Sequence, residues 1–454
     1  MSLIPYKYTK HTNDKTLFNK ISPSFEIERY HTIHKLNNIF KKHLLKFKKT
    51  YDLTSLEKYN YTKMLDLVNR WCWHQYNNPT SEDPVIPYLS DDNYNYDRFI
   101  YDLNYIVGSN ITHDDTIIVE LKKEIKTFLK KELKELKELK EKSSFDYKLK
   151  KEIKDDYTSF NLTYESKTYQ TSIHSKVYDK LKMKLKMFGN GLEEELYDNY
   201  IFCLLFRYSY MDADNQQLAI IYIIKNMFKS YGINFELFGS GINTICDNYC
   251  SLFYDIESYF GSNGSFFDIQ IDSGIYWCNP PYDETIMTNV GLKLTSILKT
   301  NSKVAFLVTI PVWDFITRNR KNKTDILRNY NRNSMEQHSD YQIYSLLKPY
   351  IVDELIIPKY KIPYFNYKKY KYIYATDTYM LLVTNNSFNK KINEKLSDHF
   401  TKIMNLNIDN KSLPPPLKRK SKKSSKKSSK KSSKKSKKSS KKSSKKSKKS
   451  SKKS

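Results

Sequence analysis

Hydrophobic and polar positions follow a helical pattern through the first third of this sequence. Up to about residue 175, apolar side chains recur at steps of three and four, which is the spacing of one face of a helix. We expect helices from the Ser22–Pro23 cap through Phe47, over Thr62–Tyr76 and over Thr116–Lys142. The sequence therefore predicts a mainly helical N-terminal domain, to which we assign residues 1–190.

The pattern changes near residue 195, where apolar segments become shorter and alternate with helical ones. The expected strands are Phe235–Phe238, Ile275–Cys278, Val304–Ile310, Ile351–Ile357 and Tyr379–Thr384, and the expected helices are Leu218–Lys229 and Glu284–Leu298. The segment from Val304 is a nearly continuous apolar run, as in a parallel sheet whose two faces are covered by helices. This alternation predicts an open α/β sheet over residues 191–390.

The C-terminal end of the chain has a composition of its own. Twenty-one of the 78 Lys and Arg residues, and no acidic residue, lie from Lys418 to Ser454, so the formal net charge of +28 falls to +7 for the remainder. A Lys/Ser repeat cannot bury apolar surface and repels itself, so we expect residues 413–454 to be a disordered tail behind a short linker at 391–412. The tail should bind polyanions non-specifically and with a strong dependence on salt. It also resembles a nuclear-localisation signal, and composition does not choose between RNA tethering, nuclear import and solubility.

Cysteine usage and the length of the apolar segments indicate an intracellular protein. Five cysteines are too few and too scattered for a disulfide framework in 454 residues. Cys246 and Cys250 lie four apart, but no second ligand pair with zinc spacing is nearby, so we expect two buried thiols on a helix and no metal site. No secretory signal is visible, and the most apolar stretches are shorter than a membrane span. We expect a location in the nucleus or cytoplasm, with no membrane partner.

The tetrapeptide Asn279-Pro280-Pro281-Tyr282 follows an expected strand and precedes an expected helix. An asparagine side-chain oxygen and a backbone carbonyl can each accept one hydrogen of an NH2 group, which aims the nitrogen lone pair at a methyl donor. Two prolines stiffen the turn and contribute no competing N–H. An aromatic ring in the fourth position gives an extruded base a face for stacking, worth about 1–3 kcal/mol. The turn is expected at the carboxyl end of its strand, where open α/β sheets bind ligands. This chemistry needs positioning in a water-poor pocket and no strong base.

A second turn, Gly239-Ser240-Gly241, follows the apolar segment that ends at Phe238. Small residues there would let a nucleotide-like cofactor approach the backbone, although an ordinary tight turn has the same composition. Asn279 lies 40 positions after Gly239, a feasible spacing for a cofactor turn and a catalytic turn in one sheet.

Several segments together resemble one known family. Phe260–Asp268, Ser273-Gly274, Asn279–Tyr282 and Ile310–Trp313 are similar to the core of the phosphorylated-CTD-interacting-factor-1 family, which comprises cap-specific adenosine-N6 methyltransferases. Those enzymes modify a 2′-O-methyladenosine next to the 7-methylguanosine cap of mRNA. The resemblance covers roughly Arg207 to Thr384. It implies a Rossmann-like class I methyltransferase domain behind a helical domain, S-adenosyl-L-methionine as methyl donor, and capped mRNA or another RNA as substrate.

The chain departs from that family in three respects. The commonest fourth motif residue is Phe, whereas Tyr282 stands here and keeps the stacking face. Nothing resembles the N-terminal WW module of the vertebrate members, since no two of the four Trp residues lie about 20 apart. The Lys/Ser tail has no matching counterpart, so substrate targeting can differ.

The expected site residues fall into three groups. The expected catalytic residues are Asn279, Pro280, Pro281 and Tyr282, the expected cofactor-binding residues are Arg207, Phe238, Gly239, Ser240, Gly241 and Asp268, and candidate RNA contacts are Trp313, Arg318, Arg320, Lys321 and Lys323. Arg207 sits in an apolar helical segment and could clamp the donor carboxylate, but a structural salt bridge is an equal alternative. The basic residues from Arg318 could equally form a solvated loop. Tyr and Lys residues are interleaved from Lys368 to Tyr374, which suits either a cap-binding or base-stacking surface or the edge of a β-hairpin.

Alternative functions use the same tetrapeptide. A DNA adenine-N6 methyltransferase or a protein glutamine-N5 methyltransferase would grip an NH2 group in the same way. The Phe260–Asp268 match and the basic segments weigh against a protein substrate. A catalytically silent RNA-binding subunit would retain the fold, but the intact motif argues against decay.

Overall fold

A computed structural model gives the architecture of the protein. It describes residues 21–51, 67–68, 71–72, 75, 83–89, 94–107, 110–141, 147–189, 191–211, 218–220, 228, 230–312, 339–357, 364–373, 377–385 and 395–398. The predicted linker at 391–412 lies outside this set except for 395–398, and the predicted tail lies outside it entirely.

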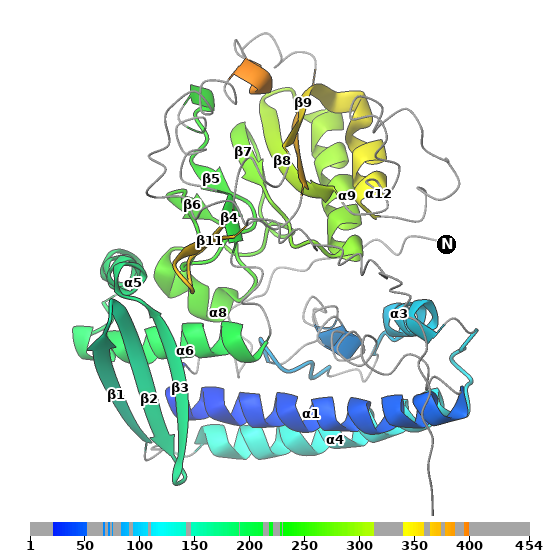
Figure 1. Ribbon diagram of the computed structural model, residues 1–454, viewed down its shortest axis with the longest axis vertical. Helices are drawn as coiled ribbons and strands as arrows, with labels where there is room; N and C mark the ends of the chain where they lie inside the picture. Colours follow the sequence, from blue (N-terminus) through cyan, green and yellow to red (C-terminus); the bar gives the residue numbers. More distant parts are fainter. Residues whose placement is uncertain are drawn as a thin grey trace, which may run out of the picture. The chain divides into compact units, whose positions relative to one another are not determined.

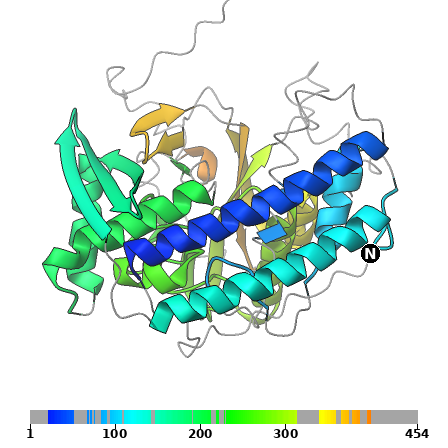
Figure 2. The ribbon, with the colours of Figure 1, turned by 90° about the horizontal axis from the view of Figure 1, so that it is seen from below.

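Two long helices form the base of the N-terminal part. Helix α1 (Pro23–Thr50) begins at Ser22, whose hydroxyl accepts a hydrogen bond from the Phe25 amide at 3.2 Å. Helix α4 (Thr116–Glu141) runs beside α1, and α3 (Asp97–Val107) precedes it (Figures 1 and 2). The predicted helices that begin at Ser22–Pro23 and Thr116 are confirmed, whereas most of Thr62–Tyr76 lies outside the described residues.

A three-stranded antiparallel sheet follows, and the prediction that residues up to 175 are mainly helical is wrong there. Its strands are β1 (Tyr147–Lys154), β2 (Tyr157–Tyr164) and β3 (Lys167–His174), in the order β1-β2-β3. In β2, alternate residues from Thr158 to Tyr164 are buried, which is the period of a strand with one covered face. The sheet packs against α5 (Ser175–Phe188) and α6 (Tyr197–Tyr210), with a short 3-10 turn, η2 (Glu194–Leu196), between these helices.

The second sheet has six strands in the order β6-β5-β7-β8-β12-β9. In chain order these are β5 (Phe235–Glu236), β6 (Asn248–Tyr249), β7 (Gly274–Cys278), β8 (Val304–Val312), β9 (Ile351–Ile357) and β12 (Asp377–Thr384). The strands β6, β5, β7 and β8 are parallel, and β12 pairs antiparallel with both β8 and β9. A single parallel bridge, Tyr249 to Ser262, extends the pairing beyond β6. All five predicted strands are present, although β5 ends at Glu236 rather than Phe238.

Helices and short turns complete this sheet. Helix α9 (Glu284–Thr300) packs against α12 (Ser339–Leu347), and side chains from both join one apolar core with Val308 and Leu381 of the sheet. The shorter elements are α8 (Tyr254–Glu257), η4 (Ser258–Phe260) and η5 (Lys348–Tyr350). The predicted helix from Glu284 is confirmed, and the fold is a mixture of helices and a mixed sheet.

A small third sheet joins distant segments in the order β11-β10-β4. Its strands are β4 (Leu218–Ile220), β10 (Tyr364–Asn366) and β11 (Lys371–Ile373). The predicted helix over Leu218–Lys229 is wrong at its start, because Leu218–Ile220 pairs with β10 about 145 residues later in the chain. The Lys- and Tyr-rich segment forms the hairpin of β10 and β11, as one of the two alternatives proposed.

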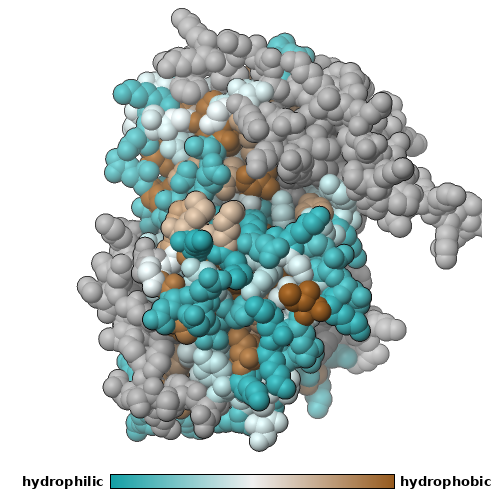
Figure 3. Space-filling model, turned by 90° about the vertical axis from the view of Figure 1, so that its left-hand side faces the viewer, coloured by the Kyte–Doolittle hydropathy of each residue, from teal (hydrophilic) through white to brown (hydrophobic). Residues whose placement is uncertain are grey.

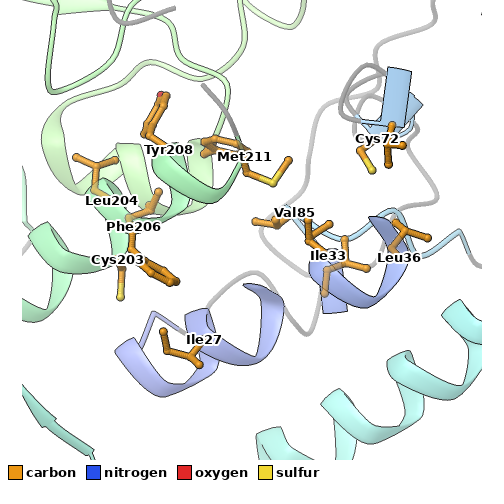
Figure 4. Packing of buried hydrophobic residues seen from close by; sticks show 14 of the residues in the cluster. Ile27, Ile33, Leu36, Cys72, Val85, Cys203, Leu204, Phe206, Tyr208 and Met211 are labelled. Carbon is orange, nitrogen blue, oxygen red and sulfur yellow. The ribbon is translucent and has the colours of Figure 1, made fainter. Parts of the chain in front are cut away.

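The largest apolar core continues across the boundary predicted at residue 190. It contains Ile27 and Leu36 of α1, Phe206 of α6, and Ile242 and Phe260 from the later part of the chain. Figure 4 shows side chains of α1 and α6 in this cluster. The division into domains stays a prediction. Within the described residues no helix is long and apolar enough to cross a membrane.

Candidate functional site

The Asn279–Tyr282 turn connects the carboxyl end of β7 to α9. The Asp283 amide donates to the Pro281 carbonyl at 2.8 Å, and the Asp283 carboxylate accepts from the Ile286 amide at 3.1 Å, which caps α9. Pro280 is buried, and Asn279 and Tyr282 are half-buried. Below the turn, the Trp277 indole donates to the Thr309 hydroxyl at 3.1 Å and ties β7 to β8. The turn thus lies at the sheet edge predicted for it.

A chain of hydroxyl groups holds the Tyr282 ring. The Tyr282 and Tyr364 hydroxyls lie 2.8 Å apart, and the Tyr364 hydroxyl lies 2.6 Å from that of Thr378 on β12. The Tyr282 hydroxyl also donates to the Asn279 side-chain oxygen over a long 3.5 Å. Burial, reinforced by the neighbouring phenol, raises the pKa of Tyr282 far above its ordinary value. Both tyrosines therefore stay neutral at physiological pH. The series of hydrogen bonds ends at Asn279, the residue predicted to bind an NH2 group.

The Gly239-Ser240-Gly241 turn is closed by its own hydrogen bonds. The Gly239 amide donates to the Cys250 carbonyl at 2.8 Å, and the Ser240 amide donates to the Asn243 side-chain oxygen at 2.8 Å. The Gly241 amide donates to the Glu257 carboxylate, also at 2.8 Å. Because these three amides already donate within the chain, the turn is rigid, and these N–H groups are not available to bind a ligand.

Packing inside the protein accounts for part of the need for glycine at this turn. A Cβ added at Gly239 would lie 3.1 Å from the Glu236 carboxyl group, and one added at Gly241 would lie 3.1 Å from Phe260 Cβ. Both distances are tighter than ordinary contact. Of the two explanations for the small residues, approach of a cofactor and an ordinary tight turn, these contacts support the second, because side chains of this chain fill the space beside both glycines.

Two buried acidic residues support the turn. The Glu257 carboxylate accepts from the Gly241 amide and from the hydroxyls of Tyr208 and Tyr249, each at 2.8 Å. Glu236 is 1% exposed, and its Oε2 atom has no hydrogen-bond partner among the described residues. Burial raises the pKa of Glu236 to about 8, against the opposing hydrogen bond from Thr244. Glu236 thus retains a proton at neutral pH, whereas Glu257 is satisfied as an acceptor.

Two lysines of α5 hold the same region from the other side. The Lys180 ammonium donates to the carbonyls of Ile242 and Thr244 at 3.0 and 2.9 Å, and Lys184 donates to the Phe260 carbonyl at 3.4 Å. Sequence reasoning missed these residues, although their spacing of four beside Leu181 and Leu185 places two lysines along the buried side of a helix. Helix α5 therefore positions the turn expected to bind the cofactor.

Phe238 and Asp268, the two remaining residues expected to bind the cofactor, lie near one cluster of aromatic rings. Phe238 contacts the rings of Phe266 and Phe267 at 5.1 and 6.0 Å, and Asp268 follows them directly. The Asp268 Oδ1 atom is buried without a hydrogen-bond partner among the described residues. Burial raises the pKa of Asp268, although the Lys293 ammonium opposes this shift. An unsatisfied buried carboxylate oxygen beside three aromatic rings suits the polar edge of a nucleoside.

The predicted donor clamp Arg207 is instead a structural ion pair. Its Nε and Nη2 atoms donate to the two Glu26 oxygens at 2.8 and 2.7 Å, and Nη1 donates to both Asp255 oxygens at 2.8 Å. The side chain is fully buried. Because two carboxylates already bind the guanidinium group, it is not available to bind the carboxylate of a methyl donor. The structural salt bridge, which was the other interpretation of the sequence, is the one observed.

The remaining candidates have simple outcomes. Cys246 and Cys250 are buried as expected, but neither lies on a helix, since they flank β6. Among the residues that the structure describes, no cluster of His, Cys, Asp or Glu could hold a metal ion. The five candidate RNA contacts from Trp313 to Lys323 lie outside the described residues.

Comparison with known proteins bears on the region that carries both turns. Residues 189–345 match the family model described as "Phosphorylated CTD interacting factor 1 WW domain". The chain is also similar to the mRNA (2′-O-methyladenosine-N(6)-)-methyltransferases of Mus musculus and Homo sapiens, each 31% identical over 121 residues, which is 25% of this chain and 17% of each relative. The matched range contains α6, β5 to β8 and the Asn279–Tyr282 turn. The predicted resemblance to this family is confirmed, while the chain spans about one sixth of the length of these relatives.

Proposed function

We propose that this protein is an S-adenosylmethionine-dependent methyltransferase that methylates adenine N6 in RNA, with 2′-O-methyladenosine beside the mRNA cap as the preferred target. The observation that carries the proposal is the Asn279–Tyr282 turn at the carboxyl end of β7, inside the range that resembles the cap-specific family. The strand order reverses between β5 and β7, and open α/β sheets bind ligands at the carboxyl ends of strands at such a point, which supports this edge as the binding edge.

The strand arrangement supports a Rossmann-like class I methyltransferase domain. Four parallel strands are followed by an antiparallel strand, β12, inserted between β8 and β9. The glycine turn follows β5 and the tetrapeptide follows the adjacent strand β7. The glycine turn and the tetrapeptide are therefore neighbours at one edge, which supports assigning the first to the cofactor and the second to catalysis.

The residues near the glycine turn fit a nucleoside cofactor. The Asp268 Oδ1 atom can accept a hydrogen bond from an adenine amine or a ribose hydroxyl, and the rings of Phe238 and Phe266, which contact each other, offer an apolar surface. Gly239 is half-buried and would give that cofactor a rigid backbone surface, whereas Ser240 and Gly241 are buried and would support it from below. When bound, S-adenosylmethionine supplies a methyl group activated by its positively charged sulfur. Arg207 takes no part in this assignment.

The reacting amine is held by the turn itself. The Asn279 side-chain oxygen and the Pro280 carbonyl accept the two N6 hydrogens, and the Tyr282 ring stacks on the base. This grip leaves the nitrogen lone pair directed towards the methyl group. The Asn279 side-chain oxygen and the Pro280 carbonyl would hold the two N6 hydrogens while the bound donor supplies the methyl group. One N6 proton would then be lost from the methylated nitrogen to solvent when the site opens, so no strong base would be required.

Capped mRNA is the proposed partner, and the nucleus or cytoplasm is the proposed location. The Lys/Ser tail adds a non-specific polyanion-binding segment, and its removal beyond Pro416 should weaken RNA binding at low salt without changing donor affinity. The basic residues from Arg318 to Lys323 remain proposed RNA contacts.

A substrate panel tests the proposal. Labelled S-adenosylmethionine is supplied with capped RNA beginning in 2′-O-methyladenosine, the same RNA uncapped, DNA and a glutamine peptide, and products are identified by mass. We expect N6-methylated adenosine in the capped RNA. Label only in DNA would establish a DNA methyltransferase, and label only in the peptide would end the nucleic-acid proposal. RNA binding without label in any substrate would identify a silent subunit.

A further inference from the structure

We propose that the β10–β11 hairpin is a binding platform for the RNA chain that follows the methylated nucleotide. In this assignment Lys369 and Lys371 bind phosphates, and the rings of Phe365 and Tyr372 stack with bases. The identity of the ligand as RNA rests on the proposed function, whereas the platform itself rests on the contacts described below.

The hairpin begins at the candidate active site. Its first strand carries Tyr364, whose hydroxyl lies 2.8 Å from that of Tyr282 in the catalytic turn. Strands rise about 3.3 Å per residue, so the far end of the hairpin lies roughly 10 Å from this contact. Because successive strand residues point to opposite faces, Phe365 and its cross-strand partner Tyr372 lie on the face opposite Tyr364. RNA leaving the Asn279–Tyr282 turn would therefore pass along the edge of the hairpin to reach these rings.

The hairpin carries a positive charge that no acidic residue within it neutralises. Residues 364–373 include Lys368, Lys369 and Lys371 and no acidic residue. Lys369 and Lys371 are exposed, whereas the Lys368 ammonium donates to the Ser209 hydroxyl at 3.1 Å. The exposed Lys176 of α5 adds a third ammonium, 5.9 Å from the Tyr370 ring centre. This part of the surface suits a chain of phosphates.

An aromatic cluster lies among these lysines. The Phe365 ring is approached at steep angles by Tyr367, Tyr370 and Tyr372, with centroids 4.8, 5.1 and 5.0 Å away. All four rings are half-buried, so each keeps some accessible surface. Single-stranded RNA is bound by this combination, because every base can stack on a ring while cations contact the backbone.

The tip of the hairpin is fixed before any ligand arrives. Tyr370 stacks on His174 of β3 with centroids 3.6 Å apart and planes 13° apart, and the Tyr157 hydroxyl of β2 donates to the Lys369 carbonyl at 3.0 Å. The Lys369 amide donates to the Asn366 side-chain oxygen at 2.7 Å. A preformed surface loses less conformational entropy on binding than a mobile loop, which favours binding at this position.

One acidic turn bounds the platform. Asp155 and Asp156 join β1 to β2, and Asp156 is close enough to His174 to oppose the lowering of its pKa by burial. The negative charges of Asp155 and Asp156 therefore disfavour phosphates at this turn, and phosphates are expected along Lys369 and Lys371. Figure 3 shows the face of the molecule on which α5 and this sheet lie, where hydrophilic groups predominate.

A paired-charge experiment on the full chain tests the platform. The variant Lys369→Gln/Lys371→Gln removes two exposed ammonium groups, and Lys123→Gln/Lys126→Gln on α4 removes two others as the matched control. Methylation of a capped 20-nucleotide RNA and of a capped dinucleotide is compared, with RNA affinity measured across a range of salt. The Lys/Ser tail is present in every sample and contributes equally.

We expect the hairpin variant to bind the long RNA about tenfold more weakly at low salt, with the salt slope reduced by about 1.4 because two phosphate contacts are lost. Donor affinity, melting temperature and turnover of the dinucleotide should not change. RNA carrying 4-thiouridine after the first nucleotide should crosslink to the peptide containing Tyr372. Wild-type affinity in the hairpin variant, or an equal loss in the α4 control, overturns the platform. Loss of binding in a protein that methylates no RNA would overturn the proposed function and leave the platform standing.

Discussion

The hydroxyl groups of Tyr282 and Tyr364 lie 2.8 Å apart and connect the candidate catalytic turn to a different sheet. Tyr282 belongs to the tetrapeptide after β7, whereas Tyr364 lies on β10 and reaches on to Thr378 of β12 at 2.6 Å. The family that this chain resembles most often has Phe at the position of Tyr282, and Phe cannot make such a bond. In this protein the orientation of the stacking ring therefore depends on residues more than 80 positions away.

Loss of this hydroxyl bond should slow methylation without unfolding the protein. We expect Tyr282→Phe and Tyr364→Phe each to lower kcat about three- to tenfold, the range of a neutral hydrogen bond, because the ring remains but is less well oriented. The double variant should be no worse than either single one. Steady-state kinetics with capped RNA would measure this, and effects that multiply would show that the two tyrosines act independently.

Replacement of the gripping side chain should remove the reaction and spare donor binding. We expect Asn279→Ala to lower the methylation rate at least 100-fold, comparable to the loss of one preorganised hydrogen-bonding group in an active site. Donor affinity, measured by calorimetry, should remain within about twofold. A fully active Asn279→Ala protein would remove the proposed mechanism whatever the substrate.

The lysine clamp on α5 should govern affinity for the donor. Lys180→Met keeps the length and apolar stem of the side chain but releases the Ile242 and Thr244 carbonyls, so the turn beside them loses a support. We expect donor affinity to fall about five- to twentyfold, or about 1–2 kcal/mol. This is less than the full contribution of two charge-assisted hydrogen bonds, because the donor is affected only through the turn that they support. The exposed neighbour Lys186→Met is the control and should bind normally. Equal binding by both variants would show that α5 does not position the turn.

The buried carboxyl group of Glu236 should make stability depend on pH. Its pKa is about 8 in the folded protein against an ordinary 4.5, so between these values the folded state keeps a proton that the unfolded state has lost. The free energy of unfolding should therefore fall as pH rises from about 4.5 to about 8, by on the order of 4 kcal/mol. Glu236→Gln should lack this fall and be more stable than wild type above pH 8. The free energies of unfolding of wild type and Glu236→Gln are measured by chemical denaturation. A difference between them that is the same at pH 5 and at pH 9 would contradict the raised pKa of Glu236.

The Glu26–Arg207 ion pair should affect stability and leave donor recognition unchanged. Although burial opposes it, the charges of Arg207 and Arg29 lower the pKa of Glu26 to about 2, so its contribution is present above pH 4.5 and is lost as pH falls towards 2. Glu26→Gln leaves the guanidinium group partly uncompensated and should cost roughly 3–5 kcal/mol. Donor affinity of the folded variant, measured well below its melting temperature, should match wild type. A selective loss of donor binding at unchanged stability would restore Arg207 to the cofactor site.

The elements around the candidate catalytic turn could be predicted because each is specified by residues within its own segment. The apolar run from Val304 and the prolines at 280 and 281 place a strand, a turn and a helix within a few residues of their observed limits. The β1–β3 sheet was missed because alternating charges conceal its pattern. Its turns, Asp155-Asp156 and Glu165-Ser166, have positive φ angles at residues other than the glycines that usually mark hairpins.

Long-range pairing explains what could not be predicted. Strand β4 is defined by β10, which lies far along the chain, and no property of Leu218–Ile220 alone reveals that partner. The role of Arg207 was undecided for the same reason, since its carboxylates are 181 residues before it and 48 residues after it. Lys180 and Glu257 contact the glycine turn and the residues that follow it through backbone atoms, and such contacts leave no signal in the pattern of side chains.

The apolar core that joins α1 to Phe260 has a consequence for folding during synthesis of the chain. Ribosomes release α1 first, but Ile27 and Leu36 cannot complete their packing until Phe206, Ile242 and Phe260 have been translated. For more than 200 residues of synthesis the apolar side of α1 therefore lacks partners that it has in the native protein. Nascent chains halted before residue 260 should bind chaperones that protect exposed apolar helices, and longer ones should release them.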